Sequence, residues 1–195
     1  MLNSQSFWGR LGGVARLGPL AVALLVLPLQ PTPTRAAESA VPEYRVKALF
    51  LINFAKYVEW PGAAFPSPTS PIIIGLIGEN RFGDNLANAV AEKAIDGHPV
   101  VLRQLGHDDS PLGCHILFIS GSEKSRFPEL LERLKNQPIL TVSDINHFAE
   151  QGGIIGFVKK EDRIRLAIDL GAAHRANLQL SSKLLSVADS VHGKN

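Results

Sequence analysis

The chain has 195 residues, of which 45% are hydrophobic, and a formal net charge of +2 from 20 Lys and Arg against 18 Asp and Glu. This near balance excludes the strongly basic field on which nucleic-acid and anionic-membrane binding depend. Three of the arginines lie within the first 37 residues, so removing that segment turns +2 into −1. The single cysteine, Cys114, excludes an intramolecular disulfide.

Residues 1–37 have the pattern of a secretory signal peptide. Two arginines precede the apolar run Leu17–Leu29, which is too short to span a bilayer comfortably. Small residues then predict cleavage after Ala36 or Ala37. We therefore expect an exported, periplasmic protein whose mature part, residues 38–195, is one domain and does not span the membrane. An uncleaved membrane anchor is the alternative.

The segment Tyr44–Pro61 predicts a strongly apolar first helix. Pro61 disfavours helical geometry at Trp60 and is expected to end the helix there. On a helical wheel an apolar arc of roughly 200° faces a thin polar stripe, so the helix needs covering nearly all round. The arc holds Val46, Ala48, Phe50, Leu51, Phe54, Ala55, Tyr57 and Val58.

Strands and helices then alternate. Continuous apolar or β-branched runs predict buried strands, as in a parallel sheet. The expected strands are 72–77, 99–105, 115–119 and 139–142. Between them we expect one helix that carries Leu86, Val90 and Ala94, and another over 127–134 capped by Ser122 or Ser125. Ser143 is expected to cap a further short helix that ends near 152.

The pattern changes after residue 153. The runs 154–158 and 164–168 flank a charged turn and predict a β-hairpin. The alternating charges of 164–168 predict an edge strand with one exposed face. A last helix is expected after a cap at Ser181 or Ser182. The predicted fold is a single α/β domain, with a mostly parallel sheet flanked by helices and a C-terminal antiparallel hairpin at one edge.

The motifs of common catalytic, cofactor and metal sites are missing from the sequence. The glycines after residue 74 lack the G-x-G-x-x-G spacing, no two of the six histidines have the spacing of a local metal site, and no G-x-S-x-G is present. Cys114 and His115 are neighbours on a strand and should point to opposite faces, with Cys114 a buried thiol or a free thiol open to intermolecular pairing. We predict no catalytic, cofactor or metal residues and no enzyme; a hydrolase assembled from distant segments is a weaker alternative.

Two groups of side chains are candidate binding residues. The first is the aromatic end of the leading helix, where Trp and Tyr favour protein contacts. The second is a basic group that could meet an acidic partner or a small acid. Ordinary core packing and a solvated surface are the respective alternatives. The candidates are Tyr57, Trp60 and Phe65, and Arg163, Arg165, His174 and Arg175.

An ordered set of segments resembles the YfiR-like family of small secreted bacterial proteins. The segments are LFLINFAKYVEWP (49–61), GHPVVLRQL (97–105), CHILFIS (114–120), PILTVSD (138–144), GGIIGFV (152–158) and LQLSSKLLSVA (178–188). The resemblance implies a non-enzymatic periplasmic repressor that binds an inner-membrane diguanylate cyclase and holds down cyclic-di-GMP synthesis. It also implies an OmpA-like outer-membrane lipoprotein as a second partner, and a homodimer. Family members often carry paired cysteines, which this chain lacks.

A different class of function is also compatible with the sequence. An α/β sheet offers a crevice at its switch point, where a periplasmic sensor domain could hold a small ligand. His174 and Arg175 are the expected contacts in that case.

Overall fold

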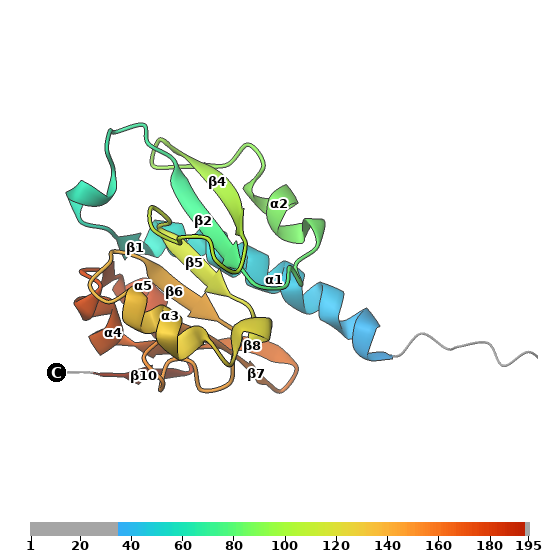
Figure 1. Ribbon diagram of the computed structural model, residues 1–195. Helices are drawn as coiled ribbons and strands as arrows, with labels where there is room; N and C mark the ends of the chain where they lie inside the picture. The colour runs from blue at the N-terminus through green and yellow to red at the C-terminus, as the bar shows by residue number, and fades with distance from the viewer. Residues whose placement is uncertain (1–34, 194–195) are drawn as a thin grey trace, which may run out of the picture. The chain divides into compact units, whose positions relative to one another are not determined.

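An eight-stranded sheet with helices on both faces organises residues 35–193, the part that the computed structural model describes (Figure 1). Residues 1–34 of the predicted signal peptide lie outside the described part of the chain. The strands of this sheet are β2 (Ile72–Ile77), β3 (Ala94–Ile95), β4 (His98–Leu105), β5 (Ile116–Ile119), β6 (Leu140–Ser143), β7 (Ile155–Lys160), β8 (Arg163–Asp169) and β10 (Ser190–His192). The α-helices are α1 (Arg35–Tyr57), α2 (Asp84–Val90), α3 (Phe127–Arg133), α4 (Leu170–Arg175) and α5 (Ser182–Ser186). The predicted α/β class, with a C-terminal antiparallel hairpin, is confirmed.

The strand order is β10-β8-β7-β6-β5-β2-β4-β3. All neighbours from β7 to β4 are parallel, and β7 pairs antiparallel with β8. From β2 the chain moves to β4 on one side and returns as β5 on the other. The carboxyl ends of β2 and β5 therefore flank a topological switch point, where α/β sheets commonly bind ligands.

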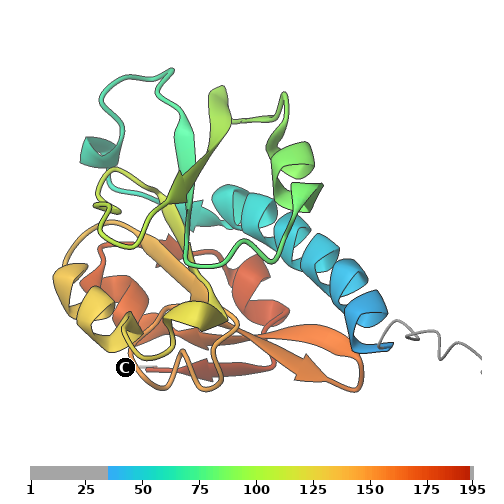
Figure 2. The ribbon, with the colours of Figure 1, turned by 45° about the vertical axis from the view of Figure 1, so that its right-hand side comes forward.

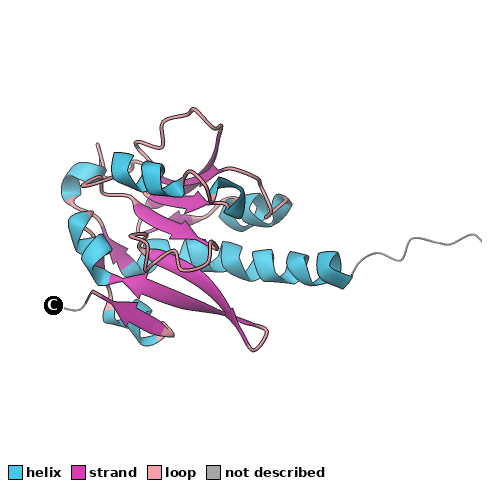
Figure 3. Ribbon diagram, turned by 60° about the horizontal axis from the view of Figure 1, so that its bottom comes forward, coloured by secondary structure: helices cyan, strands magenta, loops and turns pink. Residues whose placement is uncertain are grey.

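Alternate residues of the central strands pack into two separate hydrophobic layers, one on each face of the sheet. In β2, Ile74 and Leu76 face the layer formed with α1, whereas Ile73 and Ile77 face the layer formed with α3. In Figure 1, α1 passes behind the sheet and α3 lies in front, and Figure 3 shows helices on both sides of the strands. Burial on both faces explains the continuous apolar runs that predicted these strands.

The buried side of α1 differs from the predicted arc. Val46 and Tyr57 were expected inside the arc, but they are 42% and 36% exposed. Ile52, which is outside the predicted arc, is buried, and so is Lys47 at 3% exposure. The buried face of the helix is the one that includes Tyr44, Leu51 and Phe54. It is offset around the helix axis by about half a residue step from the predicted arc. No helix within residues 35–193 is long and apolar enough to cross a membrane.

The end of α1 is also a correction. The helix stops at Tyr57 and not at Trp60, because β1 (Val58–Glu59) pairs antiparallel with β9 (Gln179–Leu180). Pro61 then begins a short 3₁₀ turn, η1 (Gly62–Ala64).

Three further local predictions are wrong. Ala94 lies in β3, which pairs with β4, so α2 ends at Val90. No helix directly follows Ser143: residues 146–152 form turns, and the Ser143 hydroxyl accepts a hydrogen bond from the Ile145 N–H at 3.0 Å. Neither predicted serine caps α3, whose N-cap is Arg126; the 3₁₀ turn η2 (Gly121–Glu123) precedes it. The predicted Ser181 cap of α5 is confirmed, because Ser181 Oγ accepts from the Leu184 N–H.

The hairpin does not form the outermost strand of the sheet. β10 pairs parallel with β8, so β10 is the edge. The first half of β8, which carries Arg163 and Arg165, nevertheless stays at the edge, as expected. β10 covers only Ala167–Asp169, so the exposed Arg163 and Arg165 have β7 alone as a neighbouring strand.

Candidate functional site

The predicted aromatic group lies at the edge of the sheet where the parallel strands begin. Trp60 and Phe65 meet edge to face, with ring centroids 6.5 Å apart. The Trp60 indole N–H donates to the His115 carbonyl at 3.2 Å, just before β5. Both rings are half-buried and pack against the core, whereas Tyr57 stays exposed on the last turn of α1. The group is therefore part core and part surface.

The His115 ring packs against this aromatic group. Its ring stacks on Phe65 with centroids 4.5 Å apart, and Phe65 also packs on His98. Nδ1 accepts from the Ile73 N–H at 3.1 Å, so Nε2 carries the proton and donates to the Ala64 carbonyl. Burial lowers the pKa of His115, and this outweighs the opposing effect of that carbonyl. His115 is thus a buried histidine with both ring nitrogens hydrogen-bonded.

A surface pocket of about 430 Å³ opens beside Trp60. It is lined by Glu59, Trp60, Pro61, His174, Asn177, Leu178 and Gln179. The β1–β9 pairing brings the end of α1 next to the turn that follows α4. We call this the amino-edge pocket. An aromatic wall with imidazole and amide groups could hold a small molecule or a side chain of a partner protein.

The four predicted basic residues do not form one surface. Arg163 and Arg165 lie in the first half of β8, whereas His174 and Arg175 lie on α4 beyond its other end. Roughly 20 Å of extended strand separates the first pair from α4. Only His174 lines the amino-edge pocket; Arg175 forms a loose ion pair with Asp169 at 3.8 Å.

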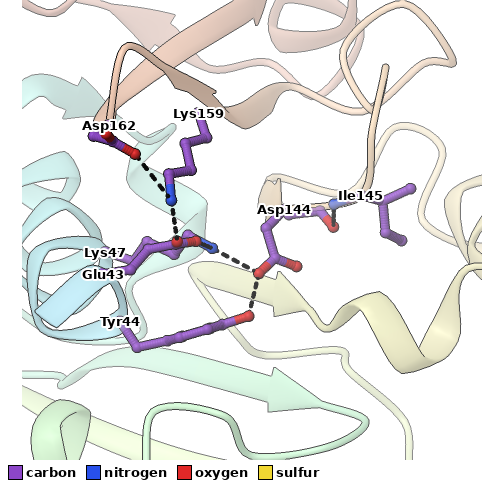
Figure 4. Close-up of polar contacts among 8 residues, drawn as sticks. Glu43, Tyr44, Lys47, Asp144, Ile145, Lys159 and Asp162 are labelled. Carbon is purple, nitrogen blue, oxygen red and sulfur yellow. Dashed lines mark hydrogen bonds and ion pairs between the residues drawn. The ribbon is translucent and has the colours of Figure 1, made fainter. Parts of the chain in front are cut away.

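Sequence reasoning missed a polar cluster at the opposite edge of the sheet (Figure 4). Lys47 Nζ lies 2.8 Å from Asp144 Oδ2 and 2.6 Å from Glu43 Oε1, and the Tyr44 hydroxyl donates to Asp144 Oδ2 at 2.5 Å. Burial, followed by the hydrogen bond to Asp144, raises the pKa of the Tyr44 hydroxyl above its usual value. We call these four residues the carboxyl-edge cluster. Two signals could have found it: a lysine on the apolar face of a helix, and an aspartate directly after a buried parallel strand.

The described side chains include no cluster of metal ligands. Within residues 43–193 no three His, Cys, Asp or Glu side chains come together as metal ligands would. Cys114 is a buried thiol, the first of the two alternatives, and burial raises its pKa. It packs in the α3 layer while His115 packs on Phe65, so the two do not form a nucleophile–base pair.

Two comparisons with known proteins bear on this geometry. A search of curated proteins finds no match. A family model described as YfiR/HmsC-like matches residues 44–189, about three quarters of the chain. The match begins at Tyr44 of the carboxyl-edge cluster, includes the aromatic group and ends just before β10. Such a match suggests a periplasmic protein that regulates a diguanylate cyclase, from a family known as regulatory and not catalytic. The chain belongs to the YfiR/HmsC-like family.

Proposed function

We propose that the protein is a non-enzymatic periplasmic repressor that binds the periplasmic domain of an inner-membrane diguanylate cyclase and lowers cyclic-di-GMP synthesis. The observation that carries the proposal is the family match over residues 44–189, which takes in nearly all of the described α/β domain. Repression by binding needs no catalytic group. The repressor has only to bind an inactive cyclase conformation more tightly than the active one, which shifts the population toward the inactive state.

The outward stripe of α1 is the surface that we propose for this contact. Val46, Leu49, Asn53 and Tyr57 follow one another at helical spacing, and all four are exposed. Trp60 and Phe65 follow the end of the helix in sequence and are half-buried against the core. Figure 2 shows α1 along one side of the domain, with α2 beside its middle. Such a stripe supplies the apolar area that a protein contact buries.

A pull-down tests the proposal. The chain purified from the periplasm is immobilised and exposed to solubilised membranes from its own bacterium. We expect capture of a diguanylate cyclase, and loss of capture with Tyr57→Ala. Val101→Ala is the matched control, because Val101 is also exposed, at 44%, but lies on β4. Equal capture by both variants would move the contact away from α1.

The resemblance extends the proposal to two further contacts. An OmpA-like outer-membrane lipoprotein would bind the repressor and withdraw it from the cyclase, and two copies of the chain would form a homodimer. Sedimentation of the purified chain tests the dimer, and co-purification with tagged lipoproteins tests the second partner.

The amino-edge pocket favours one other function, a periplasmic sensor of a small ligand. Trp60 and His174, two of the predicted binding residues, line its wall together. A bound metabolite would raise the melting temperature through its binding free energy, and His174→Ala would remove the shift. If a metabolite screen gives no shift, this second function is not supported.

A further inference from the structure

A second cavity, of about 230 Å³, lies at the carboxyl edge of the sheet. Its walls come from α1, from the loops that follow β2, β5 and β6, and from the β7–β8 hairpin. This is the switch-point edge, where the loops of parallel strands converge. The cavity is lined by Glu43, Tyr44, Lys47, Arg81, Gly121, Asp144, Asn146, Phe157, Lys159 and Ile164.

The floor of this cavity contains an acceptor that no protein group uses. Asp144 is about nine-tenths buried, and its Oδ2 accepts from both Lys47 and Tyr44. Its Oδ1 accepts no hydrogen bond from the described residues. Gly121 lies beside this oxygen, because a Cβ at that position would be in van der Waals contact with Oδ1, at 3.6 Å. An acceptor held this rigidly suits a hydroxyl donor on a ligand.

The rim of the cavity carries two cations. Arg81 lies over the Tyr44 ring, with its guanidinium carbon 5.1 Å from the ring centroid, and it has no carboxylate within 4.0 Å among the described residues. Lys159 forms only loose ion pairs: its Nζ lies 4.0 Å from Glu43 Oε2 and 3.5 Å from Asp162 Oδ1 (Figure 4). Neither cation is neutralised by a close ion pair.

The balance of charge indicates the sign of the ligand. Three cations and two carboxylates line the cavity, and both carboxylates already accept from Lys47. A cationic ligand would therefore gain little binding free energy from these carboxylates, whereas an anionic ligand would contact Arg81 and Lys159. The volume lies below the roughly 300–1,000 Å³ of pockets for drug-sized ligands, which limits the occupant to a few carbons.

We propose that the carboxyl-edge cavity binds a small hydroxylated organic anion, with its carboxylate or phosphate at Arg81 and Lys159 and a hydroxyl that donates to Asp144 Oδ1. Lys47, Glu43 and Tyr44 are positioning residues, because they fix the Asp144 carboxylate on the cavity floor. This site is separate from the amino-edge pocket and does not depend on the proposed repressor role.

Calorimetric titration of the purified chain tests the proposal without a cyclase. The probes are glycerate and glycerol 3-phosphate, which carry both groups; glycerol, acetate and inorganic phosphate are the controls that lack one of them. We expect at least one probe to bind at millimolar concentration and the controls to bind weakly or not at all. A preference between the two probes then distinguishes a carboxylate from a phosphate source.

Two variants locate the site. Arg81→Ala removes an exposed side chain and should weaken binding roughly tenfold or more, the loss expected for a charged hydrogen bond. Arg133→Ala, an equally exposed arginine on α3, should leave the affinity unchanged. Binding should also shift the NMR amide resonances of Gly121 and Asn146. The proposal is overturned if neither probe binds, if the controls bind as tightly, or if Arg81→Ala matches Arg133→Ala.

Discussion

Replacement of Lys47 by Met tests the carboxyl-edge cluster most sharply. The substitution keeps most of the unbranched side chain but removes the cation, which leaves the Asp144 carboxylate buried with only the Tyr44 hydroxyl as partner. Breaking one side of a buried ion pair costs about 3–5 kcal/mol. Asp144 keeps about a tenth of its side-chain surface exposed and borders a cavity, so we expect the lower end, about 3 kcal/mol. In a domain of this size that lowers the melting temperature by roughly 6–12 °C.

Urea unfolding followed by circular dichroism measures this loss. Lys56→Met is the matched control, because Lys56 is exposed on the same helix and its loss should change stability by less than about 0.5 kcal/mol. Adding Asp144→Asn to the Lys47→Met variant removes the unpaired charge and should restore most of the stability. If Lys47→Met costs no more than Lys56→Met, the reasoning about a buried, paired lysine is refuted.

Three further predictions concern stability. His115 has a lowered pKa in the folded chain, so protonation favours the unfolded state: wild type should lose stability as the pH falls below about 6.5, and His115→Gln should lose less over the same range. Trp60→Ala should cost about 2 kcal/mol, less than a fully buried Trp, because the ring is only half-buried; an unchanged melting curve would contradict its packing on the core. Gly153→Ala would place a methyl group 2.1 Å from the Phe148 ring and should destabilise the chain by about 1–3 kcal/mol, whereas Gly62→Ala, with open space around it, should not; equal melting temperatures for these two variants would refute this packing.

The sheet was the most predictable part of the molecule. Ile72–Ile77 was expected as a buried strand and forms β2 with the same bounds, because a strand covered on both faces needs an uninterrupted apolar run. Local signals failed where a distant partner competed. The serine at 143 has the chemistry of a helix cap, but its hydroxyl caps a turn and also donates to the Ile119 carbonyl. β10 was not expected, and it covers the second half of β8, Ala167–Asp169, which would otherwise lie at the edge.

The candidate sites were also predictable only in part, where the residues involved are close in sequence. The aromatic residues near Pro61 were found because they are close in sequence, at and just beyond the end of one helix. Lys47 was overlooked because a single lysine among apolar residues gains meaning only from Asp144, which is 97 residues away. Long-range pairing of this kind leaves no periodic pattern in the sequence. The basic residues were grouped by their nearness in sequence, although an extended strand carries them apart.

The proposed repressor role rests on binding a cyclase, and reconstitution tests that binding directly. The captured membrane diguanylate cyclase is assayed for cyclic-di-GMP synthesis as the purified chain is added. We predict that synthesis falls with increasing amounts of the chain and that Tyr57→Ala shifts this inhibition to higher concentration. If no cyclase is captured, and deletion of the protein leaves cellular cyclic-di-GMP unchanged, the proposed function is contradicted.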